Sequence, residues 1–265
     1  MRRRNFLINM NKLLVILFFI LNAVSISKAQ NYRETTTNTN LWLMYFGNHK
    51  FSNNLGLHAE AQVRRHDVVS EWQQLLLRVG LDIYTSQARF TIGYGFIETY
   101  PYGEFPVANA FPEHRIWQQL LLPQTWGRAR ISHRYRLEQR LLGNAATGEF
   151  RDGRYENRAR YMFRSNIALQ GNTIDPGEIY VAFYDEIMIN FGKEVRYNIF
   201  DQNRLYGALG YHLGRLGTLE LGYLLHTVKQ RNLFTAANPP RNIMENNHTI
   251  QIGLFSNLSF IRPRD

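Results

Sequence analysis

The sequence contains no cysteine. This excludes disulfides, thiol chemistry and a lipid-modified cysteine at the start of a mature chain, so stability has to come from burial or from a hydrogen-bonded closed sheet. After residue 30 the sequence also lacks any apolar run of 18 residues. A membrane-spanning helix is therefore excluded in that part, because such a helix needs about 20 apolar residues.

The first 29 residues have the layout of a secretory signal peptide. A positively charged start precedes an apolar run at 13–24, and 27–29 (SKA) provide the small-x-small site that signal peptidase cuts. An uncleaved anchor is the alternative. Five of the 31 basic residues and no acidic ones lie in this segment, so its removal lowers the net charge from +10 to +5. The apparent basicity is therefore weak support for nucleic-acid binding, and we expect no nucleic-acid partner.

The dominant pattern after residue 30 is alternation of apolar and polar side chains. In 55–66 (LGLHAEAQVRRH) the leucines, alanines and valine share one face, and the charged and amide side chains share the other. Because successive strand side chains point to opposite faces, such segments are expected to be β-strands. Eleven segments are candidates: 41–48, 55–66, 74–84, 88–97, 113–122, 128–141, 154–169, 178–190, 204–213, 217–229 and 247–260, of which 41–48 and 113–122 are the weakest.

Two neighbouring candidates carry rows of arginine on their polar faces. A helix would spread the 128–140 row over its whole surface, whereas a strand gathers it on one face. The residues that we expect to share the polar interior of the fold are Arg128, Arg130, Arg134, Arg136, Glu138, Arg140, Arg154, Glu156, Arg158, Arg160 and Arg164.

Long alternating strands in an exported chain predict a transmembrane β-barrel. Several candidates run for ten to fifteen residues, whereas strands of soluble proteins mostly have about five or six and tilted membrane strands about 9–11. The expected fold is all-β, a single antiparallel barrel over 30–265 in an outer membrane, apolar outside and polar inside. A soluble β-sandwich or lipocalin-like barrel, with apolar faces inward, is the alternative. Aromatic residues expected near the membrane interfaces are Trp42, Tyr45, Trp72, Tyr84, Tyr100, Trp117 and Trp126.

The expected number of strands and the expected positions of the long connections do not fully agree. Bacterial barrels usually have an even number of strands, and alternation in 194–201 supplies a twelfth candidate, so we expect about twelve strands (10–12). Long connections fall at 101–112, 143–153, 191–203 and 230–246. With twelve strands some of them lie on the side where barrels carry short turns.

Several segments resemble a known family. They are 112–119 (PEHRIWQQ), 133–140 (HRYRLEQR), 157–161 (NRARY), 185–186 (DE) and 200–204 (FDQNR). Together they resemble the family described as domain of unknown function 2490, whose members look like outer-membrane barrels, over roughly 33–260. The resemblance implies the fold and the location, and it carries over no activity and no catalytic residue.

The arginine rows allow two interpretations. In the first, arginines and interleaved glutamates, among them Glu60, Glu113, Glu178 and Glu186, form ion pairs that fill a narrow barrel and make it rigid. In the second, the rows form a cationic lumen that attracts small anions. The first is favoured. The expected partners are outer-membrane lipid and small anions.

No motif for catalysis, metal or cofactor binding is found in the sequence. Ser132 and His133 are adjacent, so on a strand they face opposite sides and cannot act together. Gly93 and Gly95, and likewise Gly207 and Gly210, are interpreted as places where the barrel bends or where an interior arginine needs room. The expected function is that of a structural or passive-transport barrel with small anionic solutes as cargo. The alternatives are an outer-membrane enzyme acting on lipid or lipopolysaccharide, and a protein that binds or assembles envelope components.

Overall fold

The structure is a computed structural model, and it describes residues 33–195, 197–235 and 240–261. The predicted signal peptide, 1–29, lies outside these residues. The described ranges contain eleven strands: β1 (Arg33–Lys50), β2 (Leu55–His66), β3 (Glu71–Tyr84), β4 (Arg89–Thr99), β5 (Phe111–Trp126), β6 (Ala129–Asn144), β7 (Glu149–Ala168), β8 (Ile179–Phe191), β9 (Phe200–His212), β10 (Thr218–Phe234) and β11 (Arg241–Ser256), with a short 3-10 turn, η2 (Gly214–Leu216), between β9 and β10. Among the described residues, no helix is long and apolar enough to cross a membrane.

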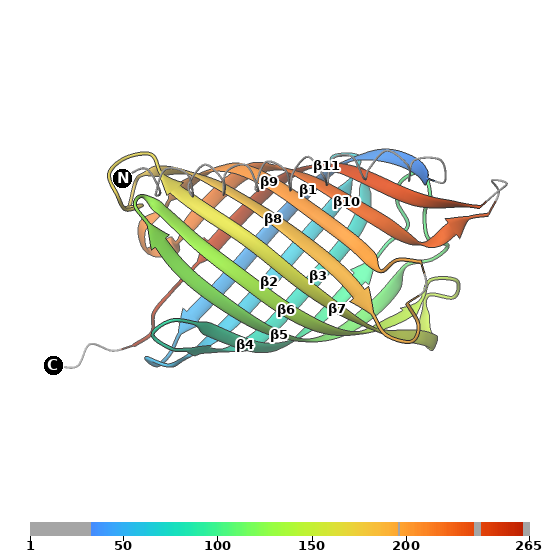
Figure 1. Ribbon diagram of the computed structural model, residues 1–265, viewed down its shortest axis with the longest axis horizontal. Coiled ribbons are helices and arrows are strands. Elements are labelled where there is room, and N and C mark those ends of the chain that lie inside the picture. Colours follow the sequence, from blue (N-terminus) through green and yellow to red (C-terminus); the bar gives the residue numbers. More distant parts are fainter. Residues whose placement is uncertain (1–32, 196, 236–239, 262–265) are drawn as a thin grey trace, which may run out of the picture.

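The strands close into one barrel (Figure 1). Each strand runs antiparallel to its neighbours in sequence, and β1 pairs with β11 in parallel. The parallel pair is a geometric consequence of the odd number, since strands that alternate in direction begin and end with the same direction. The all-β barrel fold is thereby confirmed.

The expectation of twelve strands is wrong. All eleven candidate segments lie within or overlap the eleven observed strands, but the twelfth candidate, 194–201, forms no strand of its own: its described residues before Phe200 belong to the connection between β8 and β9, and β9 begins at Phe200. Gly192 has a φ of 127°, which ends β8, and the amide of Asn190 donates to the carbonyl of Ile199 at 2.8 Å, so the chain folds back as a hairpin. Alternation over three apolar positions does not distinguish such a connection from a strand.

The strand pairing fixes the tilt of the barrel. Following paired residues once around the barrel from Lys50 returns to β1 at Thr36, which is 14 residues away. For eleven strands this stagger corresponds to a tilt of about 40°, within the usual range for closed barrels. The register also brings the polar faces of all strands to the same side.

The apolar faces point outward and the polar faces inward. On β3, Leu77, Val79 and Leu81 are exposed on the outside of the barrel, whereas Arg78 and Asp82 are buried inside. The other strands follow the same rule, with most exposed large apolar side chains on the outer face. This arrangement contradicts the alternative of a soluble barrel with an apolar interior.

The two ends of the barrel differ. The connections β2–β3, β4–β5, β6–β7, β8–β9 and β10–β11 lie where β1 begins, which we call the loop end (right in Figure 1). The other connections form the turn end, with tight turns at 51–54, 85–88 and 127–128. All four long connections expected from the sequence therefore fall at the loop end, because eleven strands place them there and twelve do not.

Two tryptophans expected at the membrane interfaces lie in the lumen instead. Trp42 and Trp117 are only 1% and 0% exposed, whereas Trp72 is 43% and Trp126 81% exposed. The parity of the strand explains this difference. Trp42 is an even number of residues from Asn40, and Trp117 from Arg115, so each shares the inward polar face of its strand.

Candidate functional site

The lumen holds most of the predicted arginines and glutamates. The structure places nine of the eleven residues inside the barrel: Arg134, Arg136, Glu138, Arg140, Arg154, Glu156, Arg158, Arg160 and Arg164. Arg130 lies at the mouth of the turn end and is exposed. Arg128 is exposed in the turn before β6, because β6 begins only at Ala129 and the row extends past the sheet.

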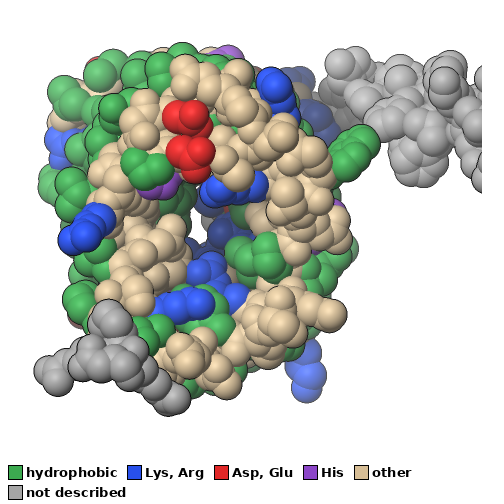
Figure 2. Space-filling view, turned by 90° about the vertical axis from the view of Figure 1, so that its left-hand side faces the viewer, with side chains coloured by type: hydrophobic (Ala, Val, Ile, Leu, Met, Phe, Trp, Pro, Cys, Tyr) green, Lys and Arg blue, Asp and Glu red, His purple; other side chains and the backbone are tan. Residues whose placement is uncertain are grey.

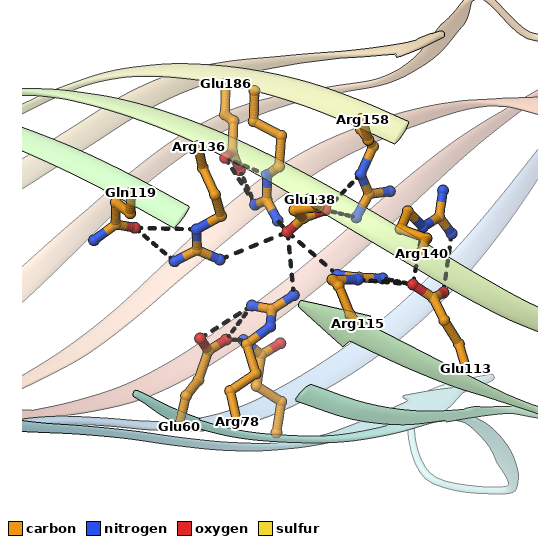
Figure 3. A network of polar contacts seen from close by, with 12 residues as sticks. Glu60, Arg78, Glu113, Arg115, Gln119, Arg136, Glu138, Arg140, Arg158 and Glu186 are labelled. Carbon is orange, nitrogen blue, oxygen red and sulfur yellow. Dashed lines mark hydrogen bonds and ion pairs between the residues drawn. The ribbon is translucent and has the colours of Figure 1, made fainter. Parts of the chain in front are cut away.

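Glu138 is the centre of a network of ion pairs (Figure 3). Its carboxylate lies 2.6 Å from Nη2 of Arg158 and 2.8 Å from Nη1 of Arg160. Arg115, Arg78 and Arg136 approach the same carboxylate at 3.4, 3.7 and 3.8 Å. Five guanidinium groups from β3, β5, β6 and β7 thus converge on one fully buried glutamate from the middle of β6.

Further carboxylates extend the network across the barrel. Glu113 accepts from Arg115 and Arg140 at 2.6 and 2.9 Å. Glu186 on β8 lies 2.6 Å from Arg134 and 2.7 Å from Arg160. We call the set formed by these contacts the charged layer: Glu60, Arg78, Glu113, Arg115, Arg134, Arg136, Glu138, Arg140, Arg158, Arg160, Glu186 and Asp201.

Interleaving resolves a conflict between like charges. Arg136 and Arg160 are directly opposite in the β6–β7 register, and so are Arg115 and Arg140 in the β5–β6 register. Opposed like charges destabilise a sheet. Here a glutamate of the layer lies between the members of each pair, Glu138 for the first and Glu113 for the second.

Several residues of the site were not in the predicted set. Arg78, Arg115 and Arg204 are each the one arginine of their strand, and Asp201 is the one acidic residue of β9, so they form no row in the sequence, although the positions of Arg78 and Arg115 on polar faces could have indicated them. Glu178, expected on a polar face with the other glutamates, lies at the turn end and accepts from the amide of Asp175 at 2.8 Å.

Two buried arginines are held by amides and indoles. Arg64 donates to the side-chain oxygens of Gln62 and Gln74, and its guanidinium carbon lies 3.8 Å from the ring centre of Trp42. Arg136 donates to Gln119 through two nitrogens, and it lies over Trp117 at 4.6 Å. These are the two tryptophans that the inward face carries, and they act as stacking surfaces for cations.

The centre of the charged layer is buried. Glu138 is 0% exposed, and the arginines around it are also buried, although they stand in the lumen of a barrel. Near β9, β10 and β1 the lumen beside the charged layer is occupied by Trp42. Its ring contacts the ring of His226 edge-on, and the guanidinium group of Arg204 lies over its face.

The connection between β4 and β5, residues 100–110, covers the loop end. Thr36 donates to Glu104 at 2.7 Å, Tyr102 to Glu245 at 3.1 Å, and Gln230 to the carbonyl of Phe105 at 3.0 Å. Burial and the adjacent carboxylate of Glu245 raise the pKa of the Tyr102 phenol. These contacts are with β1, β10 and β11, and β10 lies five strands from β5, so the connection crosses the mouth.

A cavity of about 270 Å³ opens from the charged layer toward the turn end. Its lining comprises Trp42, Met44, Phe46, Asn48, His58, Glu60, Gln62, Arg78, Arg89, Gln119, Leu121, Ser132, Arg134, Arg136, Arg160, Met162, Arg164, Tyr184, Glu186, Arg204, Gln251 and Phe255. We call it the turn-end cavity. A second cavity of about 370 Å³ shares Arg164 and Phe255 with it and reaches the mouth. Figure 2 shows this end hollowed, with basic side chains inside the opening.

The remaining expectations concern serine, histidine and glycine. Ser132 lines the turn-end cavity, whereas His133 faces outward and hydrogen-bonds Tyr161, which confirms that the two point to opposite sides. Among the glycines, Gly95 agrees with the expected need for room beside an interior arginine, whereas the side chain next to Gly93 is a tryptophan and a Cβ on Gly207 would have nothing within 4 Å. A Cβ on Gly95 would lie 2.9 Å from the side chain of Arg78, and one on Gly93 would lie 2.6 Å from the ring of Trp117.

Comparison with protein-family models places the chain in a family. The sequence model of a family described as "Protein of unknown function (DUF2490)" matches residues 39–235. This confirms the resemblance found in the sequence segments. No curated protein and no solved structure matches the chain significantly.

Proposed function

Since the chain belongs to the DUF2490 family, whose function is unknown, we propose its role from the geometry of its lumen: it is an outer-membrane β-barrel of the structural class, closed to the passage of solutes. The observation that carries this proposal is the convergence of five arginines on the fully buried Glu138. The ion pairs around it join β2 to β9 through the middle of the barrel. These ion pairs hold opposite strands of the barrel together, and their side chains occupy the space that a pore would need.

Membrane insertion is supported by the outer face. Apolar side chains surround the barrel, and its strands have 11 to 20 residues. Polar side chains on this face pair with one another. Gln118 and Gln139 exchange two hydrogen bonds at 3.0 and 3.2 Å, and Asn203 donates to Asp185 at 2.7 Å. Mutual pairing is what an environment without water requires of polar groups.

Passive transport of small anions is the second candidate. It is favoured by the lining of the turn-end cavity, in which seven arginines face two glutamates among the described residues. An excess of arginine in a lumen selects for anions. For transport, however, an anion would have to cross the charged layer, where Glu113, Glu138 and Glu186 each already hold at least two guanidinium groups.

Conductance separates the two candidates. We would express the chain with residues 1–29, isolate outer membranes, and compare the gel mobility of boiled and unboiled samples before incorporating the purified barrel into planar bilayers. A heat-dependent shift with no steady conductance is the predicted result. An anion-selective current would contradict the closed barrel and favour passive transport. A periplasmic protein without a mobility shift would contradict membrane insertion.

A further inference from the structure

The turn-end cavity has a cationic side. Arg134 and Arg136 reach into it from β6, and Arg78, Arg160 and Arg204 reach its floor. Arg134 donates a single hydrogen bond, to Glu186, although a guanidinium carries five N–H donors. Within the described part of the chain, the buried Nε atoms of Arg78, Arg134 and Arg204 have no acceptor. The carboxylates of the protein therefore leave these cations with unused capacity to bind an anion.

The opposite wall of the same cavity is apolar. Phe46 on β1 and Phe255 on β11 stack with ring centres 5.0 Å apart, and Met44 lies beside them on the cavity surface. In the closed order of the strands, β6 is five strands from β1 in one direction and five from β11 in the other. The apolar wall thus faces the arginines of β6 directly across the lumen.

We propose that the turn-end cavity is a binding site for an amphiphilic anion, that is, a carboxylate or phosphate head group on a short apolar chain. The head group lies against Arg134 and Arg136, and the chain lies against the wall formed by Met44, Phe46 and Phe255. The ligand enters from the turn end through the mouth cavity, because the charged layer closes the other side. This site lies on one side of the layer, so the proposal goes beyond the closed barrel and does not depend on membrane insertion.

The size of the cavity limits the length of the ligand's apolar chain. Its volume of about 270 Å³ lies just below the range of sites for drug-sized ligands, about 300–1,000 Å³. An eight-carbon chain is therefore a suitable probe, whereas the long chains of membrane lipids would have to extend into the mouth cavity. Charge-assisted hydrogen bonds to arginine are the strongest polar contacts available, and they give the site its preference for anions.

Calorimetric titration of the folded barrel in a non-ionic detergent tests this proposal. The probes are octanoate and octyl phosphate below their micelle concentrations, with acetate, inorganic phosphate and octyltrimethylammonium as comparison ligands. We expect the two amphiphilic anions to bind at least about tenfold more tightly than acetate or inorganic phosphate, because each buried methylene adds to affinity. The ratio between octanoate and octyl phosphate identifies the head group. Equal binding of octyltrimethylammonium, or no heat above the detergent blank with either amphiphilic anion, would overturn the proposal.

Variants separate the site from non-specific binding. Arg134→Gln is expected to weaken the binding of octanoate about tenfold or more. In this variant Glu186 still has Arg160 as an ion-pair partner at 2.7 Å, so the carboxylate stays paired. Arg128→Gln is the matched control, since this arginine is exposed in the turn outside the cavity. Gln119→Glu puts a carboxylate beside Arg136 without removing any cation, and it is also expected to weaken binding. Equal affinities for the Arg128→Gln protein and both cavity variants would refute the site.

Discussion

Removing the charge of Glu138 is expected to destabilise the barrel more than any surface change. In Glu138→Gln the shape of the side chain is kept, but five arginines within 3.8 Å lose their shared counter-charge. The carboxylate is 0% exposed, so water does not replace it. The loss of stability is therefore electrostatic, because the substitution leaves no cavity.

The magnitude follows from the number of partners. Breaking a buried ion pair by removing one member costs about 3–5 kcal/mol, because the other charge stays buried without a partner. Three of the arginines lie within 3.4 Å of Glu138, so we place Glu138→Gln at the upper end, about 4–5 kcal/mol. Glu71→Gln is the control, since Glu71 is exposed at the start of β3, and a change of less than about 0.5 kcal/mol is expected.

Urea unfolding of the barrel in liposomes measures these changes. Adding Arg136→Met to Glu138→Gln is expected to recover more than about 1 kcal/mol, because among the described residues Glu138 is the carboxylate that pairs with Arg136. If Glu138→Gln unfolds at the same urea concentration as Glu71→Gln, the network is not what holds the lumen together. The argument would also be refuted if the losses of stability in Glu138→Gln and Arg136→Met simply added up in the double variant, since the two groups would then not interact.

Two further changes test the packing of the lumen. Gly93→Ala is expected to lower stability by about 1–3 kcal/mol, because the added Cβ would lie 2.6 Å from the ring of Trp117, whereas Gly207→Ala has nothing within 4 Å and should be neutral in the same unfolding assay. Trp42→Phe is expected to cost about 1–3 kcal/mol, since its indole N–H donates to a buried glutamine oxygen at 2.7 Å. Trp126→Phe, at an 81% exposed position, should change stability by less than about 0.5 kcal/mol, and an equal loss in both variants would contradict the inward placement of Trp42.

The sequence was most informative where the alternation was long. In 55–66 it gave the bounds of β2 directly, and it assigned the arginine-bearing polar faces of β6 and β7 correctly. It failed where the pattern was short or polar. Residues 33–40 pair with β11 although they carry threonines and asparagines without alternation, whereas 194–201 alternates over three positions without forming a separate strand.

The contacts across the lumen could not be read from the sequence. Counting residues along a strand shows that Arg78 faces inward, but not that it reaches Glu138 on β6, three strands away. That contact depends on the diameter and the stagger of the barrel, which the number of strands and their register set together. Trp42 and Trp117 are a different case. Parity was available in the sequence, and the general preference of tryptophan for membrane interfaces led to the wrong assignment.

Quenching of tryptophan fluorescence by brominated lipids tests most directly whether the apolar face meets lipid and the polar face is enclosed. The variant Trp72→Phe/Trp126→Phe keeps only the two lumen tryptophans, Trp42 and Trp117. We predict that brominated lipids quench the wild-type protein, leave this variant nearly unchanged, and quench it again when Leu137→Trp adds an indole on the outer face. Quenching of the lumen-only variant as strong as that of the wild type, or none with Leu137→Trp, would contradict the account.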